Sequence, residues 1–568
     1  MIILGLNIHH PNASACVIKD GKLLFFIEEE RIVRIKNWDG FPTNSIEQCL
    51  SYCNLKMDDF DHIVINSDPS SNLKQKLFFT LRNFYNISLF RDRLKSLLRK
   101  RKTNKILNKK IINVDHHLSH ISSSAFISNF ESATCLSLDG FGDFCSGAIA
   151  QFKNNKINIK KRIYFPHSLG VLYHAITQFL GFKNFGDEYK IMGLTGYGKP
   201  TLKSKIYELV NFDEENYYKL NLRYFNFFKK NYINNNGVPK FNNLYSHKIY
   251  ELLGPERKKD EALSEYYKDL ACSLQAVYEE IFFKILNKIY KEQKLKKLCL
   301  AGGCALNSLA NGKIFDNTNF KEVFIPPYPG DSGGAIGAAM YKFHLNKDKI
   351  HSIDNSSPYL GSSYTDDQIK ISVDKLSRDK NNFKILYYKE TNDLIKNCAK
   401  MILENKILGW FQGRMEAGAR ALGNRSLLAN PTNPNIKDII NSKIKIREMF
   451  RPFAPSVLQE YAKDYFEYHQ NVDYMSMVYK IKSDKIEKIP AVCHVDHTGR
   501  LQTVNEKINP IFYNLIKEIY NINGIPMVLN TSLNENEPIV MTPNQAIDLF
   551  VRTTMDAIAI GNYLIIRK

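Results

Sequence analysis

Residues 1–30 read MIILGLNIHHPNASACVIKDGKLLFFIEEE, and their alternation of apolar runs and polar turns indicates how the fold begins. Three apolar runs predict strands, at Ile2–Asn7, Ala15–Lys19 and Lys22–Ile27. The polar turn His9–Ser14 joins the first two, and Asp20-Gly21 joins the last two. Connections this short allow only antiparallel pairing. The chain is therefore expected to open with three antiparallel strands.

Further strand-like runs alternate with helical patterns along the chain. Thr134–Leu138 ends in a glycine-rich turn, and two more apolar runs occur at Lys297–Ala301 and Val323–Ile325. Leu263–Tyr290 has the apolar spacing of a helix. Strands that alternate with helices are typical of an α/β protein.

The length of 568 residues predicts more than one domain, because single cores stop growing well below this size. The alternation of strand-like and helical segments stops around His344–Ser363, a stretch rich in Asn, Ser, Asp, Gly and Pro, so we place the domain boundary there. The expected domains are residues 1–350 and 357–568. Tyr217–Tyr250, rich in Asn, Phe and Tyr, is interpreted as an insertion that shapes an acceptor pocket.

Composition excludes several classes of protein. The ten cysteines show no CxxC pair or repeated spacing, which argues against a zinc or disulfide framework and favours a cytoplasmic location. The sequence shows no signal peptide and no apolar run long enough to cross a membrane. The net charge is +20, and Arg91–Lys110 carries ten Lys or Arg and one acidic residue. This run is interpreted as a solvated amphipathic helix, with RNA or membrane contact as the alternative.

Two histidines and two carboxylates form a candidate metal site. His116 and His120 share one face if their segment is helical, so both imidazoles could reach one ion. Asp139 follows a strand, and Asp331 lies in a glycine-containing turn. Ordinary histidines and helix-capping aspartates are the alternatives. Together the four side chains are a mixed N/O donor set suited to iron, manganese or zinc.

A glycine turn and a group of cations are candidate phosphate and nucleotide sites. Gly302 and Gly303 lie at a strand end, where backbone N–H groups could face an anion and Asn307 could reach a ribose or base. The second half of the chain is rich in cations beside glycine turns, which suits the binding of several phosphates. These cations lie in the segments Gly413–Ser426, Lys443–Arg451 and His497–Arg500.

These segments resemble the successive motifs of the NodU/CmcH-type O-carbamoyltransferase family. The motifs of the expected first domain are Asn7–Ala15, Glu28–Arg31, His116–His120, Asp139–Asp143, Glu188–Gly193, Gly302–Asn307 and Gly330–Gly333. The resemblance covers nearly the whole chain and is weakest at residues 65–110 and 205–260. It implies an actin-like ATPase (duplicated RNase H-like) N-terminal domain similar to TsaD, followed by an α/β C-terminal domain similar to YrdC.

The resemblance also implies roles for residues of the expected first domain. The metal ligands would be His116, His120, Asp139 and Asp331, with Fe(II) as the ion. Gly302, Gly303 and Asn307 would bind the nucleotide, and Lys36 would lie near the transferred group, although a surface charge is the alternative. The family often has His-Asp where this chain has Pro11-Asn12, so the catalytic histidine is His9 or His10, and we choose His10.

In the second half the resemblance implies a site that forms carbamoyl adenylate. The catalytic residues would be Arg420, Lys443 and Ser532, and the cofactor-binding residues would be Arg425, Arg451, Arg500 and Asn530. The chain departs from the family pattern at Ala419, Leu533 and Asn536. None of these departures removes a charged group.

The sequence thus predicts an ATP-dependent O-carbamoyltransferase that converts carbamoyl phosphate to carbamoyl adenylate and transfers the carbamoyl group to a hydroxyl of a small molecule or sugar. Mg²⁺ is expected with ATP. A tRNA threonylcarbamoyladenosine-type transferase is the alternative, and a non-catalytic ATP- or RNA-binding protein is the third reading. No membrane partner and no nucleic acid partner are expected, and the sequence leaves both a monomer and a homodimer as alternatives.

Overall fold

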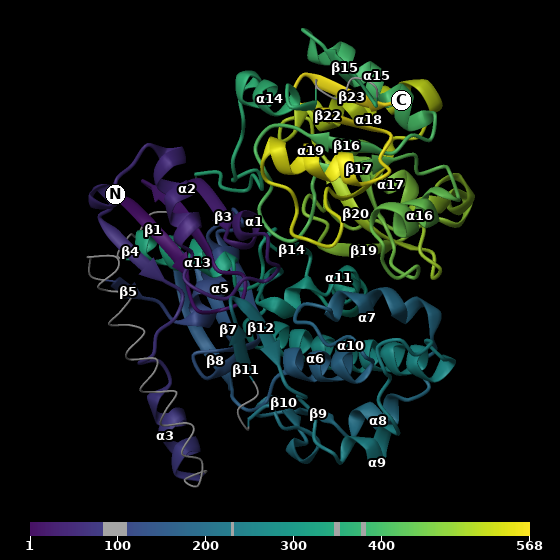
Figure 1. Ribbon diagram of the computed structural model, residues 1–568. Coiled ribbons are helices and arrows are strands. Elements are labelled where there is room, and N and C mark those ends of the chain that lie inside the picture. Colours follow the sequence, from purple (N-terminus) through teal and green to yellow (C-terminus); the bar gives the residue numbers. More distant parts are fainter. Residues whose placement is uncertain (83–110, 229–231, 346–352, 377–381) are drawn as a thin grey trace. The chain divides into compact units, whose positions relative to one another are not determined.

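The computed structural model describes the chain except residues 83–110, 229–231, 346–352 and 377–381 (Figure 1). The basic run Arg91–Lys110 therefore lies outside the described residues. The remaining chain divides into two compact units. The first comprises Met1–Glu30, Asn37–Leu306 and Ile314–Ser356, and the second comprises Arg31–Lys36, Asn307–Lys313 and Ser357–Lys568. Two short segments that precede residue 357, Arg31–Lys36 and Asn307–Lys313, thus pack with the second unit.

The first unit opens with the predicted antiparallel strands. Its first sheet has the order β3-β2-β1-β4-β5, with β1 Ile2–Asn7, β2 Ser14–Lys19, β3 Lys22–Glu28, β4 His62–Ile65 and β5 Ile111–Asn113. The pairs β1–β2 and β2–β3 are antiparallel, as the short turns require, whereas β1–β4 and β4–β5 are parallel. Nearly every side chain of β1 and β2 is buried, so helices must cover both faces of this sheet.

A second sheet repeats this topology. Its order is β14-β13-β6-β7-β8, with β6 Ser132–Gly142, β7 Cys145–Lys153, β8 Lys156–Tyr164, β13 Lys297–Ala301 and β14 Glu322–Phe324. The pairs β6–β7 and β7–β8 are antiparallel, and β13 pairs in parallel with both β6 and β14. Both sheets therefore have three antiparallel strands followed by two parallel ones, which is the duplicated RNase H-like arrangement.

Two helices of the first unit that pack closely together carry or adjoin predicted metal ligands. Helix α5 (His116–Ala125) packs against α13 (Gly333–His344). At Gly337 a Cβ atom would lie 1.8 Å from the Ser119 carbonyl oxygen, so only glycine permits this approach. The long helix α10 (Glu265–Gln293) fulfils the helical pattern predicted at Leu263–Tyr290 and lies beside α6 (Leu169–Phe179) and α7 (Glu188–Leu194) (Figure 1).

The other elements of the first unit are short. Helices are α2 (Thr43–Cys53), α3 (Leu73–Arg82), α8 (Lys203–Tyr207), α9 (Ile249–Leu253) and α12 (Ile314–Asn317). Helix α1 (Glu30–Val33) starts in the first unit and continues into the second. The segment Tyr217–Tyr250 contains β10 (Tyr217–Leu220), which pairs with β9 (Val210–Asp213), and the hairpin of β11 (Tyr232–Asn235) and β12 (Val238–Phe241).

The second unit is built on one mixed sheet of nine strands. Its order is β15-β23-β22-β16-β17-β21-β18-β20-β19. The strands are β15 Phe383–Tyr387, β16 Leu408–Phe411, β17 Arg425–Ala429, β18 Ala454–Leu458, β19 Met477–Lys480, β20 Thr498–Val504, β21 Met527–Ser532, β22 Ala557–Ile560 and β23 Tyr563–Arg567. The pairs β16–β22 and β18–β20 are parallel, and the other pairs are antiparallel.

Helices bury one face of this sheet. Helix α15 (Thr391–Leu403) and α18 (Pro510–Asn523) pack on one another, and both contribute to a core around Trp410. The other helices of the unit are α11 (Ser308–Gly312), α14 (Asp366–Val373), α16 (Ile436–Ile439), α17 (Ala462–Tyr465) and α19 (Pro543–Arg552). The α/β class predicted from the sequence is correct for both units. Among the described residues, no helix combines the length and apolar character needed to cross a bilayer.

Candidate functional site

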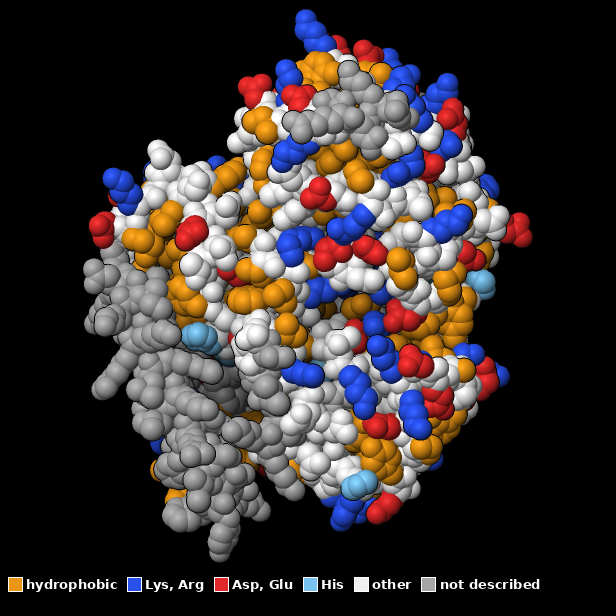
Figure 2. Space-filling model, viewed as in Figure 1, with side chains coloured by type: hydrophobic (Ala, Val, Ile, Leu, Met, Phe, Trp, Pro, Cys, Tyr) orange, Lys and Arg blue, Asp and Glu red, His pale blue; other side chains and the backbone are white. Residues whose placement is uncertain are grey.

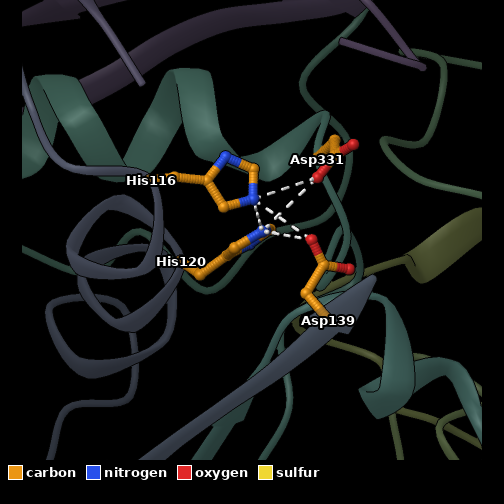
Figure 3. A group of neighbouring side chains, drawn as sticks. All are labelled: His116, His120, Asp139 and Asp331. Atoms are coloured by element: carbon orange, nitrogen blue, oxygen red, sulfur yellow. Dashed lines mark hydrogen bonds and ion pairs between the residues drawn. The ribbon is translucent and has the colours of Figure 1, made fainter. Parts of the chain in front are cut away.

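The predicted metal ligands converge in the first unit. Figure 3 shows the imidazoles of His116 and His120 and the carboxylates of Asp139 and Asp331 pointing toward one point. The Nε2 atoms of His116 and His120 are 3.1 Å apart, and Asp139 Oδ2 is 3.1 Å from the first and 3.5 Å from the second. Asp331 Oδ1 lies 3.5 Å and 3.4 Å from the same two atoms.

Secondary structure places each of these side chains. His116 and His120 are one turn apart on α5, whose N-terminus is capped by the Asp115 carboxylate, which accepts from the Leu118 N–H. Asp139 lies near the end of β6, and Asp331 lies just before α13. The crossing of α5 and α13 at Gly337 therefore fixes the histidines relative to Asp331.

The donor set fits a divalent transition metal. Ligand atoms that each lie about 2.0–2.2 Å from one ion are separated from their neighbours by about 2.8–3.6 Å. The five distances above fall in that range, and all four atoms lie within 4.8 Å of one another. Both histidines are completely buried and the aspartates are nearly so. A buried cluster of two imidazoles and two carboxylates needs either protons or a cation to balance its charge.

Without an ion, protons perform this role. Burial disfavours an imidazolium, but hydrogen bonds and charge from Asp139 and Asp331 outweigh it and raise the pKa of His120 to about 9. The pKa of His116 is raised by the same carboxylates against the effect of burial. Although burial opposes it, hydrogen bonds from both histidines hold the pKa of Asp139 well below its usual value. The cluster is therefore poised to exchange protons for a metal ion.

The glycine turn after β13 orients one ligand. The Gly303 N–H donates to Asp139 Oδ1 over 2.8 Å and leaves Oδ2 facing the histidines. Gly302 has φ +86°, and a Cβ there would lie 2.2 Å from the Leu138 carbonyl oxygen. These glycines thus support the metal cluster, in addition to the nucleotide role predicted for them. The Asn307 side chain accepts from the Ala310 N–H and caps α11, which packs with the second unit.

His10 lies beside the metal cluster. Its ring centroid is 5.1 Å from that of His116. Burial and the positive charge of His116 lower the pKa of His10 to about 4, so a neutral imidazole is present at neutral pH. The Asn7 amide donates to the Pro11 and Asn12 carbonyls and so orders the turn that carries His10. His9 instead adopts φ +57° and donates its backbone N–H to the Gly40 carbonyl.

The second unit gathers several cations, which we name the cationic cluster. Its centre is Lys445, whose side chain is almost wholly buried. Burial, together with Arg447, Arg451 and Lys36, lowers the pKa of Lys445 well below its usual value. Burial and the guanidiniums of Arg420, Arg447 and Arg451 likewise lower the pKa of Arg500. The members are Lys36, Arg420, Lys445, Arg447, Arg451 and Arg500. A group in which cations depress one another's pKa favours polyanionic ligands.

Lys445, not Lys443, lies beside Ser532. The Lys445 ammonium donates to the Ser532 carbonyl and, over 2.7 Å, to both the carbonyl and Oδ1 of Asn534. Lys443 is exposed in the same segment. Residues two positions apart on a helical turn point in different directions, and here the buried Ile444 fixes which side faces the core. The resemblance implied Lys443 as the catalytic lysine, and the structure shows Lys445 as the lysine that contacts Ser532 and Asn534.

Ser532 is partly buried at the end of β21. Its hydroxyl donates to Asn534 Oδ1 over 2.7 Å and lies 3.4 Å from the Lys445 ammonium. The hydroxyl is therefore ordered by the same asparagine that orders the lysine. Asn534 was not among the predicted site residues, since a single asparagine in a turn carries no distinguishing signal.

Two other predicted ligand-binding residues are engaged within the protein. The Arg425 guanidinium is fully buried, stacks on Phe411 and donates to four backbone carbonyls. The Asn530 amide donates to the Ala421 carbonyl and to the side chains of Ser456 and Gln502. In this structure both side chains stabilise the loops around the cationic cluster. Glu416, which the sequence analysis passed over, helps them by accepting from three backbone N–H groups at Leu422, Asn424 and Arg425.

Comparison with known proteins identifies the family. Residues 2–340 match the family model for the carbamoyltransferase N-terminus, and residues 399–567 match that for the carbamoyltransferase C-terminus. The nodulation protein NolNO of Sinorhizobium fredii is 33% identical over 99% of this chain and 80% of its own length. An uncharacterized protein of Synechocystis is 34% identical over 99% of this chain and 96% of its own length.

Solved structures resemble this chain only loosely. Full-length HypF in its phosphate- and nucleotide-bound form is 15% identical and aligns over 61% of this chain and 56% of its own length, with a TM-score of 0.33. The fold assignment therefore rests on the strand order of the two sheets. The two family models together span most of the sequence, and this chain belongs to the carbamoyltransferase family of enzymes.

Proposed function

We propose that this enzyme is an ATP-dependent O-carbamoyltransferase with two sites. The cationic cluster of the second unit, in the expected domain 357–568, would form carbamoyl adenylate. The metal cluster of the first unit, in the expected domain 1–350, would host transfer to a hydroxyl. The observation that carries the proposal is the buried Lys445 side chain, which contacts Ser532 and Asn534 in a group of arginines, because clustered cations favour the binding of anionic ligands.

The activation step suits the cationic cluster. Loss of phosphate from carbamoyl phosphate, with water, gives carbamate, and a carbamate oxygen then attacks the α-phosphorus of ATP and displaces pyrophosphate. The triphosphate would arrive with Mg²⁺. Arg420, Arg451 and Arg500 would offset the charge that builds on the phosphates, while Lys445 and the Ser532 hydroxyl would hold the small carbamoyl group. Phosphate and pyrophosphate are thus both expected products of this step.

The transfer step suits the metal cluster. A divalent ion such as Fe(II), held by His116, His120, Asp139 and Asp331, would supply Lewis-acid stabilisation of the adenylate phosphate. The neutral imidazole of His10, next to His116, can accept the proton of the acceptor hydroxyl. The acceptor oxygen would bond to the carbamoyl carbon, and AMP would leave with the electrons of the broken C–O bond. The Gly302-Gly303 turn would approach the nucleotide.

A small molecule or sugar is the acceptor class that we propose. The relative named nodulation protein NolNO is similar to this chain over 99% of its length. A tRNA acceptor is the alternative that the net charge of +20 favours. Among the residues that the structure describes, however, the Lys and Arg side chains of each unit that are visible in Figure 2 are interspersed with Asp and Glu and form no continuous basic stripe. Recognition of a nucleic acid backbone usually requires such a stripe.

The test follows pyrophosphate release from ATP. Purified enzyme should release pyrophosphate when both ATP and carbamoyl phosphate are present, and omission of either substrate should abolish the signal. Addition of tRNA should leave the rate unchanged. Absence of any carbamoyl phosphate-dependent pyrophosphate would refute the adenylate route. Formation of product only with tRNA would establish the alternative.

A further inference from the structure

A short segment from the start of the chain is built into the second unit. Arg31–Lys36 follows β3 and Glu30 in sequence but packs with residues 357–568. Its two arginines donate to backbone carbonyls of two different loops. Arg31 is almost fully buried and donates to the Gly418 carbonyl over 2.7 Å. Gly418 is two residues from Arg420, a member of the cationic cluster.

Arg34 contacts the second loop, which follows Ser532. Its guanidinium donates to the Ile539 carbonyl over 2.8 Å and to the Pro538 carbonyl, and it lies 3.7 Å from the Glu537 carboxylate. The backbone of Arg34 is strained in this arrangement, because its φ angle is +61°, a value that residues other than glycine seldom adopt. A residue keeps such a strained backbone conformation only where the contacts around it hold it in place.

The loop held by Arg34 also fixes Asn534. The Asn534 amide donates to the Glu537 carbonyl over 2.7 Å. Its Oδ1 atom then accepts from both Lys445 and Ser532. A continuous chain of contacts therefore leads from Arg34 through residues 537–539 and Asn534 to the Lys445 ammonium.

We propose that Arg34 is a positioning residue for carbamoyl activation. It fixes the loop of residues 534–539 so that Lys445 and Ser532 face the carbamoyl group. The inference rests on the proposed activation site. Displacement of reacting groups by about 1 Å can lower a rate by about 100-fold, so a role of this kind is measurable.

The chain offers a matched control at Arg552. Its guanidinium pairs with Glu537 and Glu535 and so contacts the same loop as Arg34. Unlike Arg34, it is 46% exposed and bonds carboxylates rather than the carbonyls of residues 538 and 539. An ion pair that exposed contributes little. Arg552→Gln should therefore leave activation unchanged.

The experiment measures pyrophosphate release against carbamoyl phosphate concentration. Arg34→Gln should lower kcat/KM for carbamoyl phosphate by about 10- to 100-fold, and Arg34→Lys should recover part of the loss because lysine can still donate to a carbonyl. Melting temperature and metal content should stay at wild-type values. These two readouts separate a positioning role from a general loss of structure.

A double-mutant cycle tests the route through Asn534. If Arg34 acts through this residue, Arg34→Gln should add little to the loss caused by Asn534→Ala. Additive losses would overturn the proposal, and so would wild-type kinetics for Arg34→Gln. If Arg34→Gln does not fold, the same cycle with Arg34→Lys decides the question. Absence of pyrophosphate release by the wild type would refute the proposed function itself, which is a distinguishable result.

Discussion

His116 and His120 show how residue type and spacing can specify a site. Two imidazoles one turn apart offer two borderline nitrogen donors at fixed separation, and Asp139 and Asp331 add two hard oxygen donors. This combination suits Fe(II), Mn²⁺ or Zn²⁺ better than Ca²⁺ or Mg²⁺, which prefer oxygen ligands alone. The two carboxylates would balance the charge of a divalent ion, which matters because the site is buried.

The ligand assignment predicts metal content directly. The purified enzyme should hold about one transition metal ion per chain, as the single four-donor cluster of the described residues allows. His116→Ala together with His120→Ala should reduce this to background, because only two carboxylates would remain. Metal analysis of the purified proteins measures the effect. His247→Ala, at an exposed histidine, is the control and should keep the ion.

The two lysines of the second unit allow a sharp comparison. Lys445→Met should lower pyrophosphate release by at least about 100-fold, since it removes the ammonium that contacts Ser532 and Asn534. Lys443→Met should retain activity within about threefold, because exposed side chains contribute little. Initial rates with saturating ATP measure both effects. The reverse ranking would support the role that the resemblance implies for Lys443.

At the scale of elements, close contacts between backbones position the metal ligands. The turn Gly140–Gly142 ends β6 beside α5, and Gly337 lets α13 approach that helix. At Gly142 a Cβ atom would lie 2.0 Å from Cδ2 of His116. At Gly140, two residues away, no atom lies within 4 Å of such a Cβ. The geometry of β6 and α5 thus depends on one glycine and not on its neighbour.

This contrast predicts different outcomes for two alanine substitutions. Gly142→Ala should displace the His116 ring, lower metal content severalfold and destabilise the first unit by about 1–3 kcal/mol, the usual cost of overpacking. Gly140→Ala should preserve metal content. Metal analysis and thermal unfolding of both variants provide the measurement. Equal metal content in the two variants would show that His116 does not depend on this contact.

For the whole molecule, the two sites belong to two separately packed units. The metal ligands all lie in the first unit, and the cationic cluster lies entirely in the second. Each unit has its own sheet system and its own core, so a substitution in one core should leave the other folded.

Activation and transfer should therefore be separable by mutation. Asp331→Ala should abolish carbamoylated product yet leave pyrophosphate release within about twofold of wild type, because the two sites share no residues and belong to separately packed units. Lys445→Met should abolish both readings, since transfer consumes the adenylate. Assays of pyrophosphate release and of carbamoylated product on each variant measure the two steps separately. A parallel loss of pyrophosphate release in the Asp331 variant, with folding intact, would indicate one shared site.

Much of this organisation was predictable from local sequence. The short turns at His9–Ser14 and Asp20-Gly21 require antiparallel strands, and the helical spacing of His116 and His120 places them on one face. The strand Lys297–Ala301 was predicted with its observed bounds. These features depend on backbone geometry over a few residues, and that geometry is encoded in the order of residue types.

Other features depend on contacts between residues far apart in sequence. Periodicity did not show that Lys445 is buried while Lys443 is exposed, or that the Arg425 guanidinium is taken up by backbone carbonyls. Nor did it show that Arg31–Lys36 packs with residues more than 380 positions later. The sequence by itself determined the strands, helices and donor types, because these are local. Only the tertiary structure decided which charges face one another, because burial and long-range hydrogen bonds exist only in the folded chain.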